Sequence, residues 1–198
     1  MSLAFQCHCN TVQGELLRPD KSLRAVCYCQ DCQTYVHALG GPARVLDEHG
    51  GTEVVATQAR YIRFTAGTGA LACLSLTDRG LLRWYASCCR TPLANTPRDM
   101  RFPYASVLTT CLVSGGAHAE ALLGPVRMWV NTRHAKGTVP KPGIGQWLAL
   151  LRIAPGLLWA RLCGSWRSTP FFDVGCSRPV IEPYVLTDAE RRQARSMV

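Results

Sequence analysis

The chain has 198 residues, of which 47% are hydrophobic and 18% charged, which is too apolar for an intrinsically disordered protein and sufficient for the core of one domain. Its formal net charge of +9 suggests an anionic substrate, a nucleic acid or a membrane surface as partner. A membrane-spanning helix is excluded, because the most apolar stretch, 147–163, is interrupted by Arg152, Pro155 and Arg161.

Eleven cysteines are a high number for this length. The opening residues, 1–7, lack the basic and apolar regions of a secretion signal, so we expect a cytoplasmic, reducing environment. There, clustered cysteines bind metals more often than they form disulfides. Three tight groups contain Cys7 and Cys9, then Cys27, Cys29 and Cys32, then Cys88 and Cys89. The others stand in apolar surroundings and are expected to be buried: Cys73, Cys111, Cys163 and Cys176.

Residues 1–115 are expected to form a mainly β, zinc-binding domain of small packed antiparallel sheets. Short alternating or β-branched runs between glycine-containing turns predict strands at 54–56, 61–65, 71–76 and 81–85. The last two runs predict a hairpin whose second strand ends just before Cys88 and Cys89. Residues 91–97 are expected to be a rigid loop beside it.

Residues 116–198 are expected to be a helical and irregular extension packed on that domain. Its segments are a helical pattern over 117–133, a loop over 137–145, two short helices over 146–154 and 155–163, and an irregular stretch over 169–183. Gly124-Pro125 should split the first of these. Thr187 and Glu190 form a capping box, which predicts the start of a last helix.

The two short helices are rich in large apolar side chains. These are Trp147, Leu148, Leu150, Leu151, Ile153, Leu157, Leu158, Trp159 and Leu162, with Arg152 and Arg161 among them. Such a stretch more often packs on a core or forms a homodimer interface, and we expect one of these. The alternative is an amphipathic pair that lies on an anionic membrane.

The run Cys27-Tyr28-Cys29-Gln30-Asp31-Cys32 is the most specific pattern in the chain. In an extended CxC segment both side chains point to one face, and the following CxxC folds back, so the three thiols can converge on one ion. Zinc is the usual metal for such a site. We predict that Cys27, Cys29 and Cys32 are metal ligands and the reactive site, with a fourth position open to water, a thiolate or a substrate oxygen.

Two alternatives remain for this run. It could be a closed structural zinc site whose fourth ligand is His8, His37, Cys88 or Cys89, or it could hold an iron–sulfur cluster. Cys7, Cys9, Cys88 and Cys89 together offer enough sulfur for a second, closed site, provided that the backbone bends sharply between the two adjacent cysteines. We therefore expect one or two zinc ions.

At these residues the sequence resembles the glutathione-dependent formaldehyde-activating enzyme family, which includes centromere protein V-like proteins. Cys7-His8-Cys9-Asn10, the run 27–32 and the segment RWYASCCRTPL at 83–93 match its three elements in order. The resemblance covers about residues 5–95. The family pattern differs at Ala86, where it has a cysteine, and at Asn10 and Arg90, where it has glycine.

The resemblance implies a β-rich fold in which the first and third elements hold a structural zinc, and the second holds a zinc that binds a glutathione adduct. It also implies carbon–sulfur lyase chemistry that joins or splits formaldehyde and glutathione. Our first hypothesis is therefore a zinc-dependent lyase acting on a small thiol adduct. The second is a zinc-stabilised binding module for nucleic acid or an acidic protein, although no RRM, helix-turn-helix or C2H2 signature supports nucleic acid as the partner.

Overall fold

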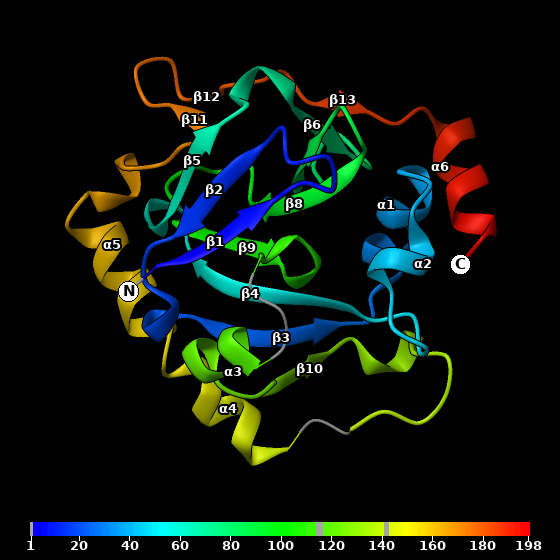
Figure 1. The fold of residues 1–198 in the computed structure, drawn as a ribbon, viewed down its shortest axis with the longest axis horizontal. Coiled ribbons are helices and arrows are strands. Elements are labelled where there is room, and N and C mark those ends of the chain that lie inside the picture. The colour runs from blue at the N-terminus through cyan, green and yellow to red at the C-terminus, as the bar shows by residue number, and fades with distance from the viewer. Residues whose placement is uncertain (1, 114–116, 141–142) are drawn as a thin grey trace.

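The computed structural model describes residues 2–113, 117–140 and 143–198, and over these ranges the chain is mainly β, as the sequence predicts (Figure 1). The principal sheet has the strand order β10-β3-β4-β9-β8-β7-β6-β13. Its strands are β3 (Leu23–Cys27), β4 (Thr52–Gln58), β6 (Leu71–Ser75), β7 (Leu82–Ala86), β8 (Thr91–Thr96), β9 (Tyr104–Leu108), β10 (Met128–Val130) and β13 (Tyr184–Val185).

Two smaller antiparallel sheets accompany it. One contains β1 (Leu3–Gln6), β2 (Gln13–Leu16) and β5 (Ile62–Ala66), and the other contains β11 (Phe172–Asp173) and β12 (Arg178–Pro179). The helices are α1 (Gln30–Ala38), α2 (Pro42–Val45), α3 (Ala117–Leu123), α4 (Ile144–Leu150), α5 (Ala154–Leu162) and α6 (Asp188–Ser196). No helix of the described residues is both long and apolar enough to cross a bilayer.

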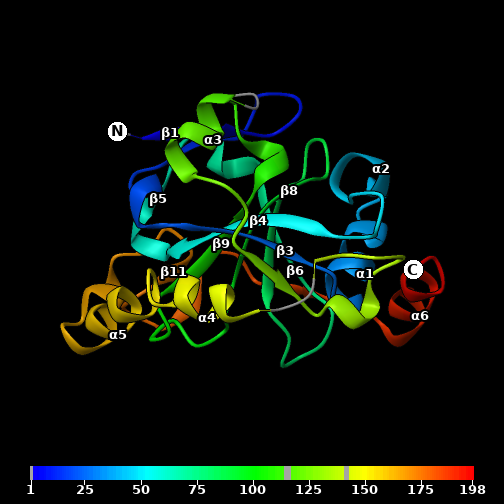
Figure 2. The same ribbon diagram turned by 90° about the horizontal axis from the view of Figure 1, so that it is seen from below.

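The principal sheet is covered on both faces (Figure 2). Along β7 the side chains alternate, as expected for a strand buried on two sides. Leu82 and Trp84 pack in the cluster that joins the principal sheet to the three-stranded sheet. Arg83 faces the other way, and its guanidinium lies 5.0 Å from the ring centre of Tyr35 in α1. We call the face of the sheet on which Arg83 meets α1 the helical face, and the second cysteine cluster and its cavity, described below, lie on this face.

The part after residue 123 differs from the expected helix. α3 forms, but the chain then enters β10, which pairs in parallel with β3, from Met128 opposite Ala25 to Val130 opposite Cys27. Gly124 has a φ of +73°, and Pro125 lacks the N–H that a continuing helix needs. β10 and β13 thus add two parallel edges to an otherwise antiparallel sheet. The predicted boundary at 115 and 116 falls outside the described residues.

The expectation of a rigid loop at 91–97 is wrong, because residues 91–96 form the strand β8, which is buried along its whole length. Its proline suggested a loop, since proline cannot donate a hydrogen bond to a neighbouring strand. The pairing of β7 with β8 shifts register at this point: Trp84 faces Ala94 and the next residue, Tyr85, faces Pro92, so Leu93 of β8 is the extra residue. The stretch expected to be irregular, 169–183, contains the short hairpin β11–β12.

Several local predictions are confirmed. β6 and β7 form the expected antiparallel hairpin. α5 has its proline in the first turn. In the capping box of α6 the backbone N–H of Glu190 donates to Thr187 Oγ1 over 3.3 Å, and the N–H of Thr187 donates to Glu190 Oε2 over 2.8 Å.

The stretch 146–163 is expected from the sequence to pack on a core or to form a homodimer interface, and most of its large side chains do not pack on the core; the homodimer interface stays a prediction. Ala149, Ile153 and Ala160 are buried, and the first two pack against β3 and β4. The exposed members are Trp147, Leu148, Leu151, Leu158, Trp159 and Leu162.

Candidate metal centres

The first cluster consists of Cys7, Cys9, Cys88 and Cys89, whose sulfurs all lie within 4.8 Å of one another. Cys7 and Cys9 lie in the tight turn after β1. Asn10 adopts a φ of +60°, and its N–H donates to the Cys7 carbonyl over 2.9 Å. The backbone N–H of Val12 donates to Cys7 Sγ over 3.3 Å. Asparagine is among the residues that tolerate this left-handed conformation, which closes the turn without glycine.

Cys88 and Cys89 lie in the turn between β7 and β8. Arg90 has a φ of +56°, so the chain bends sharply directly after the cysteine pair. Cys88 Sγ is 3.2 Å from Cys9 Sγ, 3.9 Å from Cys7 Sγ and 3.9 Å from Cys89 Sγ. Sulfurs around a tetrahedral zinc at about 2.3 Å would be about 3.8 Å apart, so these thiols have the spacing of a four-sulfur metal site.

Ala86 is fully buried in the core cluster at the end of β7, and Cys88, two residues further on, contributes to the sulfur cluster instead. Hydrogen bonds from the hydroxyl and backbone of Thr11 lower the pKa of Cys9 to about 6, whereas contact with Cys9 raises the pKa of Cys88 to about 12. One thiolate is therefore favoured and its neighbour stays protonated. Binding of a divalent cation would displace the remaining protons.

The second cluster consists of Cys27, Cys29 and Cys32, whose sulfurs also lie within 4.8 Å of one another. Cys27 ends β3, Cys29 is the N-cap of α1, and Cys32 lies in its first turn. The N–H of Cys32 donates to Cys29 Sγ over 3.3 Å, and Cys32 Sγ is 3.7 Å from Cys27 Sγ. A strand end followed at once by a helix thus brings the three thiols together at a helix N-terminus, which favours negative charge.

Negative charge in the second cluster concentrates on Cys32. Close contacts with the Cys27 and Cys29 thiols, and the guanidinium of Arg83, hold the pKa of Cys32 well below its usual value. Contact with Cys27 raises the pKa of Cys29. Arg83 Nη1 is 3.7 Å from Cys32 Sγ, and Asn131 Nδ2 is 3.6 Å from Cys27 Sγ. These donors favour thiolates, which are the form that binds a metal.

The second cluster borders a cavity of about 400 Å³ on the helical face of the principal sheet. The floor of the cavity is formed by residues that face one another on adjacent strands of the principal sheet. Arg83 pairs with Asn95, Asn95 with Ser106, and Ser106 with Ala56, so these residues form one row across β7, β8, β9 and β4. Leu150 and Ile153, from the end of α4 and just before α5, form part of the wall. The size is typical of cavities that hold small molecules.

The polar part of the floor is a buried hydrogen-bonded row. Arg83 is 3% exposed, and its Nη1 donates to Asn95 Oδ1 over 3.4 Å. Asn95 Nδ2 in turn donates to Ser106 Oγ over 3.2 Å. In the described chain no carboxylate forms an ion pair with this guanidinium. The group beside it that can carry negative charge is Cys32, as a thiolate. A buried cation of this kind favours an anion at the cavity.

The suggested fourth ligands do not join the second cluster. Among the described residues, no further His, Cys, Asp or Glu places a donor atom within the cluster. Cys88 and Cys89 belong to the first cluster. His37 is five residues beyond Cys32 in α1, so it lies about 7.5 Å further along the helix axis. His8 lies in the turn of the first cluster, where its N–H donates to Thr91.

The expectation of buried isolated cysteines is correct for Cys73 and Cys111 and wrong for Cys163 and Cys176, which are exposed. Both exposed residues lie where the chain changes direction: Cys163 caps α5, and Cys176 lies between β11 and β12. They therefore provide control positions for substitutions in the clusters.

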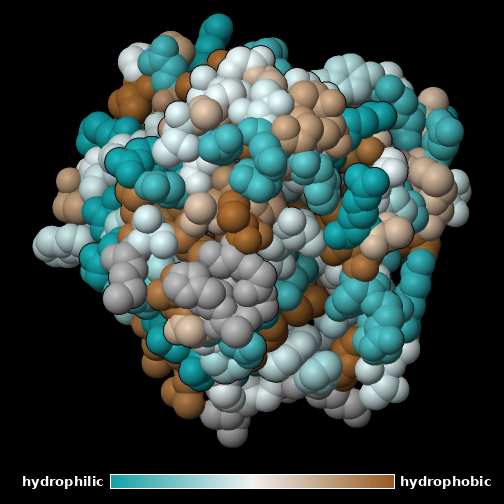
Figure 3. Space-filling model, viewed as in Figure 1, coloured by the Kyte–Doolittle hydropathy of each residue, from teal (hydrophilic) through white to brown (hydrophobic). Residues whose placement is uncertain are grey.

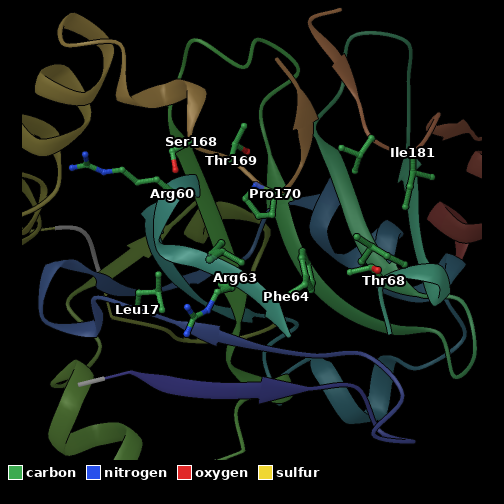
Figure 4. Close-up of a pocket in the computed structure, with 12 residues that line it drawn as sticks. Leu17, Arg60, Arg63, Phe64, Thr68, Ser168, Thr169, Pro170 and Ile181 are labelled. Carbon is green, nitrogen blue, oxygen red and sulfur yellow. The ribbon is translucent and has the colours of Figure 1, made fainter. Parts of the chain in front are cut away.

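A larger cavity of about 690 Å³ lies elsewhere, between β5 and the segment 168–181 (Figure 4). Phe64, Thr68, Pro170 and Ile181 are among the residues that line it. Arg60 and Arg63 also line it, but their guanidinium groups make hydrogen bonds elsewhere. The guanidinium of Arg60 donates to Ser165 and Tyr61, and that of Arg63 donates to Glu15. No cysteine lines this cavity.

Arg83, Asn95, Ser106 and Asn131 are the site residues that the sequence did not single out. The available signal was an arginine between Leu82 and Trp84 in a strand that is otherwise apolar. The assignment of all seven clustered cysteines as metal ligands stays a prediction, although the geometry shows that both groups could hold an ion.

Comparison with known proteins identifies a sequence family but no relative of known function. The sequence model of the family of unknown function DUF6151 matches residues 1–182. No curated protein shows a significant match. A crystal structure of a Rhodobacter sphaeroides protein is 18% identical over 65% of this chain and 100% of that chain, with a TM-score of 0.43. This likeness is too weak to carry a conclusion about fold or function.

Proposed function

We propose that this chain, which belongs to the DUF6151 family, binds zinc at its cysteine clusters and makes or breaks the carbon–sulfur bond of a small thiol adduct at the second cluster. The observation that carries the proposal is the difference between the two clusters. The first has four thiols, whereas the second has three and borders a cavity. Three protein ligands with one exchangeable position are typical of reactive zinc sites.

The donor set supports zinc as the metal. Both clusters consist of thiols alone, which suit a borderline-soft ion with tetrahedral preference. When bound, zinc would supply positive charge that stabilises the substrate sulfur as a thiolate. The proposed location is the cytoplasm, where the thiols would stay reduced and glutathione is available.

The proposed substrate class is an S-hydroxyalkyl thiol, such as the adduct of glutathione and formaldehyde. In the cleavage direction the carbon–sulfur bond breaks and its electron pair stays on sulfur. The hydroxyl oxygen loses its proton and forms the carbonyl double bond, and the sulfur takes up a proton. The step is redox-neutral, so it needs no oxidant or reductant. It requires that the adduct be oriented and that negative charge on sulfur be stabilised.

Arg83 is the residue best placed to orient such an adduct. Within the described residues its side chain donates hydrogen bonds through Nη1, which leaves other N–H groups of the guanidinium for a ligand in the cavity. A guanidinium can hold a carboxylate through two hydrogen bonds, and glutathione carries carboxylates. Asn95 and Ser106 support the guanidinium from the next strands. The apolar wall at Leu150 and Ile153 would limit water.

The resemblance to the glutathione-dependent formaldehyde-activating enzymes supports the same proposal. Cys27, Cys29 and Cys32 match the element that binds the adduct in that family. Asn10 and Arg90 adopt the left-handed conformation at the positions where the family has glycine. The first cluster retains four sulfurs despite Ala86, because Cys88 is present.

The experiment compares the wild type with Cys29→Ser and with Cys176→Ser as a matched control. We expect the wild type to bind two zinc ions and to catalyse release of formaldehyde from its glutathione adduct. Cys29→Ser should lose one zinc ion and all measurable turnover, because a hydroxyl is a poor substitute for a thiolate ligand. Cys176→Ser should change neither quantity, since Cys176 is exposed and belongs to neither cluster.

Retained turnover in Cys29→Ser after loss of that zinc ion would contradict the proposal. Binding of two zinc ions without any effect of glutathione or of its adduct would instead favour a zinc-stabilised binding module.

A further inference from the structure

Helices α4 and α5 display an apolar surface that nothing in the described chain covers. Its members are Trp147, Leu148, Leu151, Leu158, Trp159 and Leu162, and their exposed fractions range from 59% to 74%. Soluble monomers seldom expose so many large apolar side chains together, and such patches usually mark an interaction surface. We call these six residues the apolar patch.

The spacing of the apolar patch follows the helix geometry. Trp147, Leu148 and Leu151 are related as i, i+1 and i+4, and Leu158, Trp159 and Leu162 repeat the same spacing. At 100° per residue each set lies within about 100° of its helix circumference. Ala149 and Ala160, two residues after the start of each set, point to the opposite side and are buried. Each helix thus rests on a small residue and presents its large side chains outward.

The two helices are neighbours at one margin of the molecule, on the side away from α6 (Figures 1 and 2). In Figure 3 hydrophobic side chains gather along the lower left margin, in the region where α4 lies and α5 begins. The helices that carry the patch therefore lie at the periphery of the fold.

The segment that carries the apolar patch has charged residues of one sign. The sequence has no acidic residue between Glu120 and Asp173. Its basic residues in this interval are Arg127, Arg133, Lys136, Lys141, Arg152, Arg161 and Arg167. Arg152 lies in the turn between α4 and α5, Arg161 lies in the last turn of α5, and both are exposed. Arg161 acts electrostatically on Asp99, which already pairs with Arg101 over 3.1 Å, so that acid does not neutralise the region.

Tryptophan is concentrated in the same interval. Trp84 is buried in the core, and the remaining tryptophans are Trp129, Trp147, Trp159 and Trp166. Tryptophan together with arginine and leucine on a short helix is the composition of segments that lie in the interface of a bilayer.

We propose that α4 and α5 dock on a membrane surface that contains anionic phospholipid, with the apolar patch inserted between headgroups and the arginines against phosphates. The uniformly basic charge of this segment favours an anionic membrane over a second copy of the chain. A two-fold interface through this patch would bring together two copies of the same basic segment, which contains no acidic residue to pair with Arg152 or Arg161. A membrane with anionic lipid can bury the apolar side chains between its headgroups and can pair the basic side chains with its phosphates.

The test is co-sedimentation with vesicles of phosphatidylcholine alone and of phosphatidylcholine with about 30% phosphatidylserine, at low salt and at about 0.5 M salt. We expect binding to the anionic vesicles that weakens at high salt. The double variant Trp147→Ala/Trp159→Ala should bind about tenfold more weakly or worse, since both side chains are exposed in the patch. Met197→Ala, an exposed apolar position after α6, is the matched control and should bind as the wild type does.

Absence of binding to anionic vesicles, or equal binding to neutral ones, would overturn the proposal. Light scattering without vesicles provides the complementary measurement. A dimer that dissociates in the double variant would show that a second copy covers the patch and would also overturn it. The thermal unfolding midpoint of the double variant should match the wild type, because neither tryptophan is part of the core.

Discussion

Replacing Arg83 with methionine is expected to lower turnover of the thiol adduct by about a hundredfold while the protein stays folded. Arg83 is 3% exposed, faces the cavity and lies 3.7 Å from Cys32 Sγ, so it is the buried cation nearest to the proposed reaction. Methionine is long, flexible and apolar, and it can fill the space without leaving an unpaired charge.

The measurement is adduct turnover with zinc in excess, because loss of a donor to Cys32 should also weaken metal binding by about tenfold. Arg79→Met is the matched control, since Arg79 is exposed on the same hairpin. Arg83→Lys should recover part of the activity, because it keeps the charge but not the planar pair of donors. Wild-type turnover in a folded, zinc-loaded Arg83→Met protein would remove this residue from the proposed site.

Replacing Cys89 with serine is expected to release the metal of the first cluster and to lower the free energy of unfolding by about 3–5 kcal/mol. This cluster joins the turn after β1 to the turn between β7 and β8, which belong to different sheets. A bound ion there ties the three-stranded sheet to the principal sheet in the native state only, so its binding energy adds to stability.

Chemical denaturation with and without a strong chelator measures this effect. The chelator should destabilise the wild type and add little to the destabilisation already present in Cys89→Ser. Cys176→Ser should respond to the chelator as the wild type does, because Cys176 is exposed and outside both clusters. Equal zinc content and equal stability in wild type and Cys89→Ser would show that the first cluster binds no metal.

The parts of the fold that depend on local chemistry could be predicted from the sequence. The β6–β7 hairpin is signalled by two apolar runs around a glycine-containing turn, and the start of α6 by Thr187 and Glu190. The second cysteine cluster could also be anticipated, because thiols two or three residues apart can converge when the chain turns between them. The first cluster could be expected only because its two pairs together offer four sulfurs, and it forms because the fold brings Cys9 and Cys88, which are 79 residues apart, into contact.

The parts that depend on strand pairing could not be predicted in this way. The row of Arg83, Asn95 and Ser106 exists only because β7, β8 and β9 pair in one particular register. Asn95 lies in a segment whose proline and polar residues suggest a loop, and the register shift next to Pro92 depends on how β8 pairs with β7. The strand β10 could not be recognised from its own residues, because it forms by pairing with β3, which is about a hundred residues earlier in the chain.

The side chains of α4 and α5 show a limit of another kind. Their apolar spacing indicates that they need a partner, but it does not say whether that partner belongs to the same chain. In the structure Ala149 and Ala160 are buried, so they mark the side of each helix that faces the fold. Trp147 and Trp159 are exposed and mark the side that faces outward.

The central claim is that the second cluster holds a metal with one position open to the cavity. The most direct measurement is the visible absorption of protein loaded with Co²⁺ in place of zinc, recorded while glutathione is added. We predict a change in the cobalt–thiolate bands of the wild type that saturates at one glutathione per chain and is lost in Cys29→Ser. A spectrum that glutathione leaves unchanged in the wild type, or changes equally in Cys29→Ser, would contradict the claim.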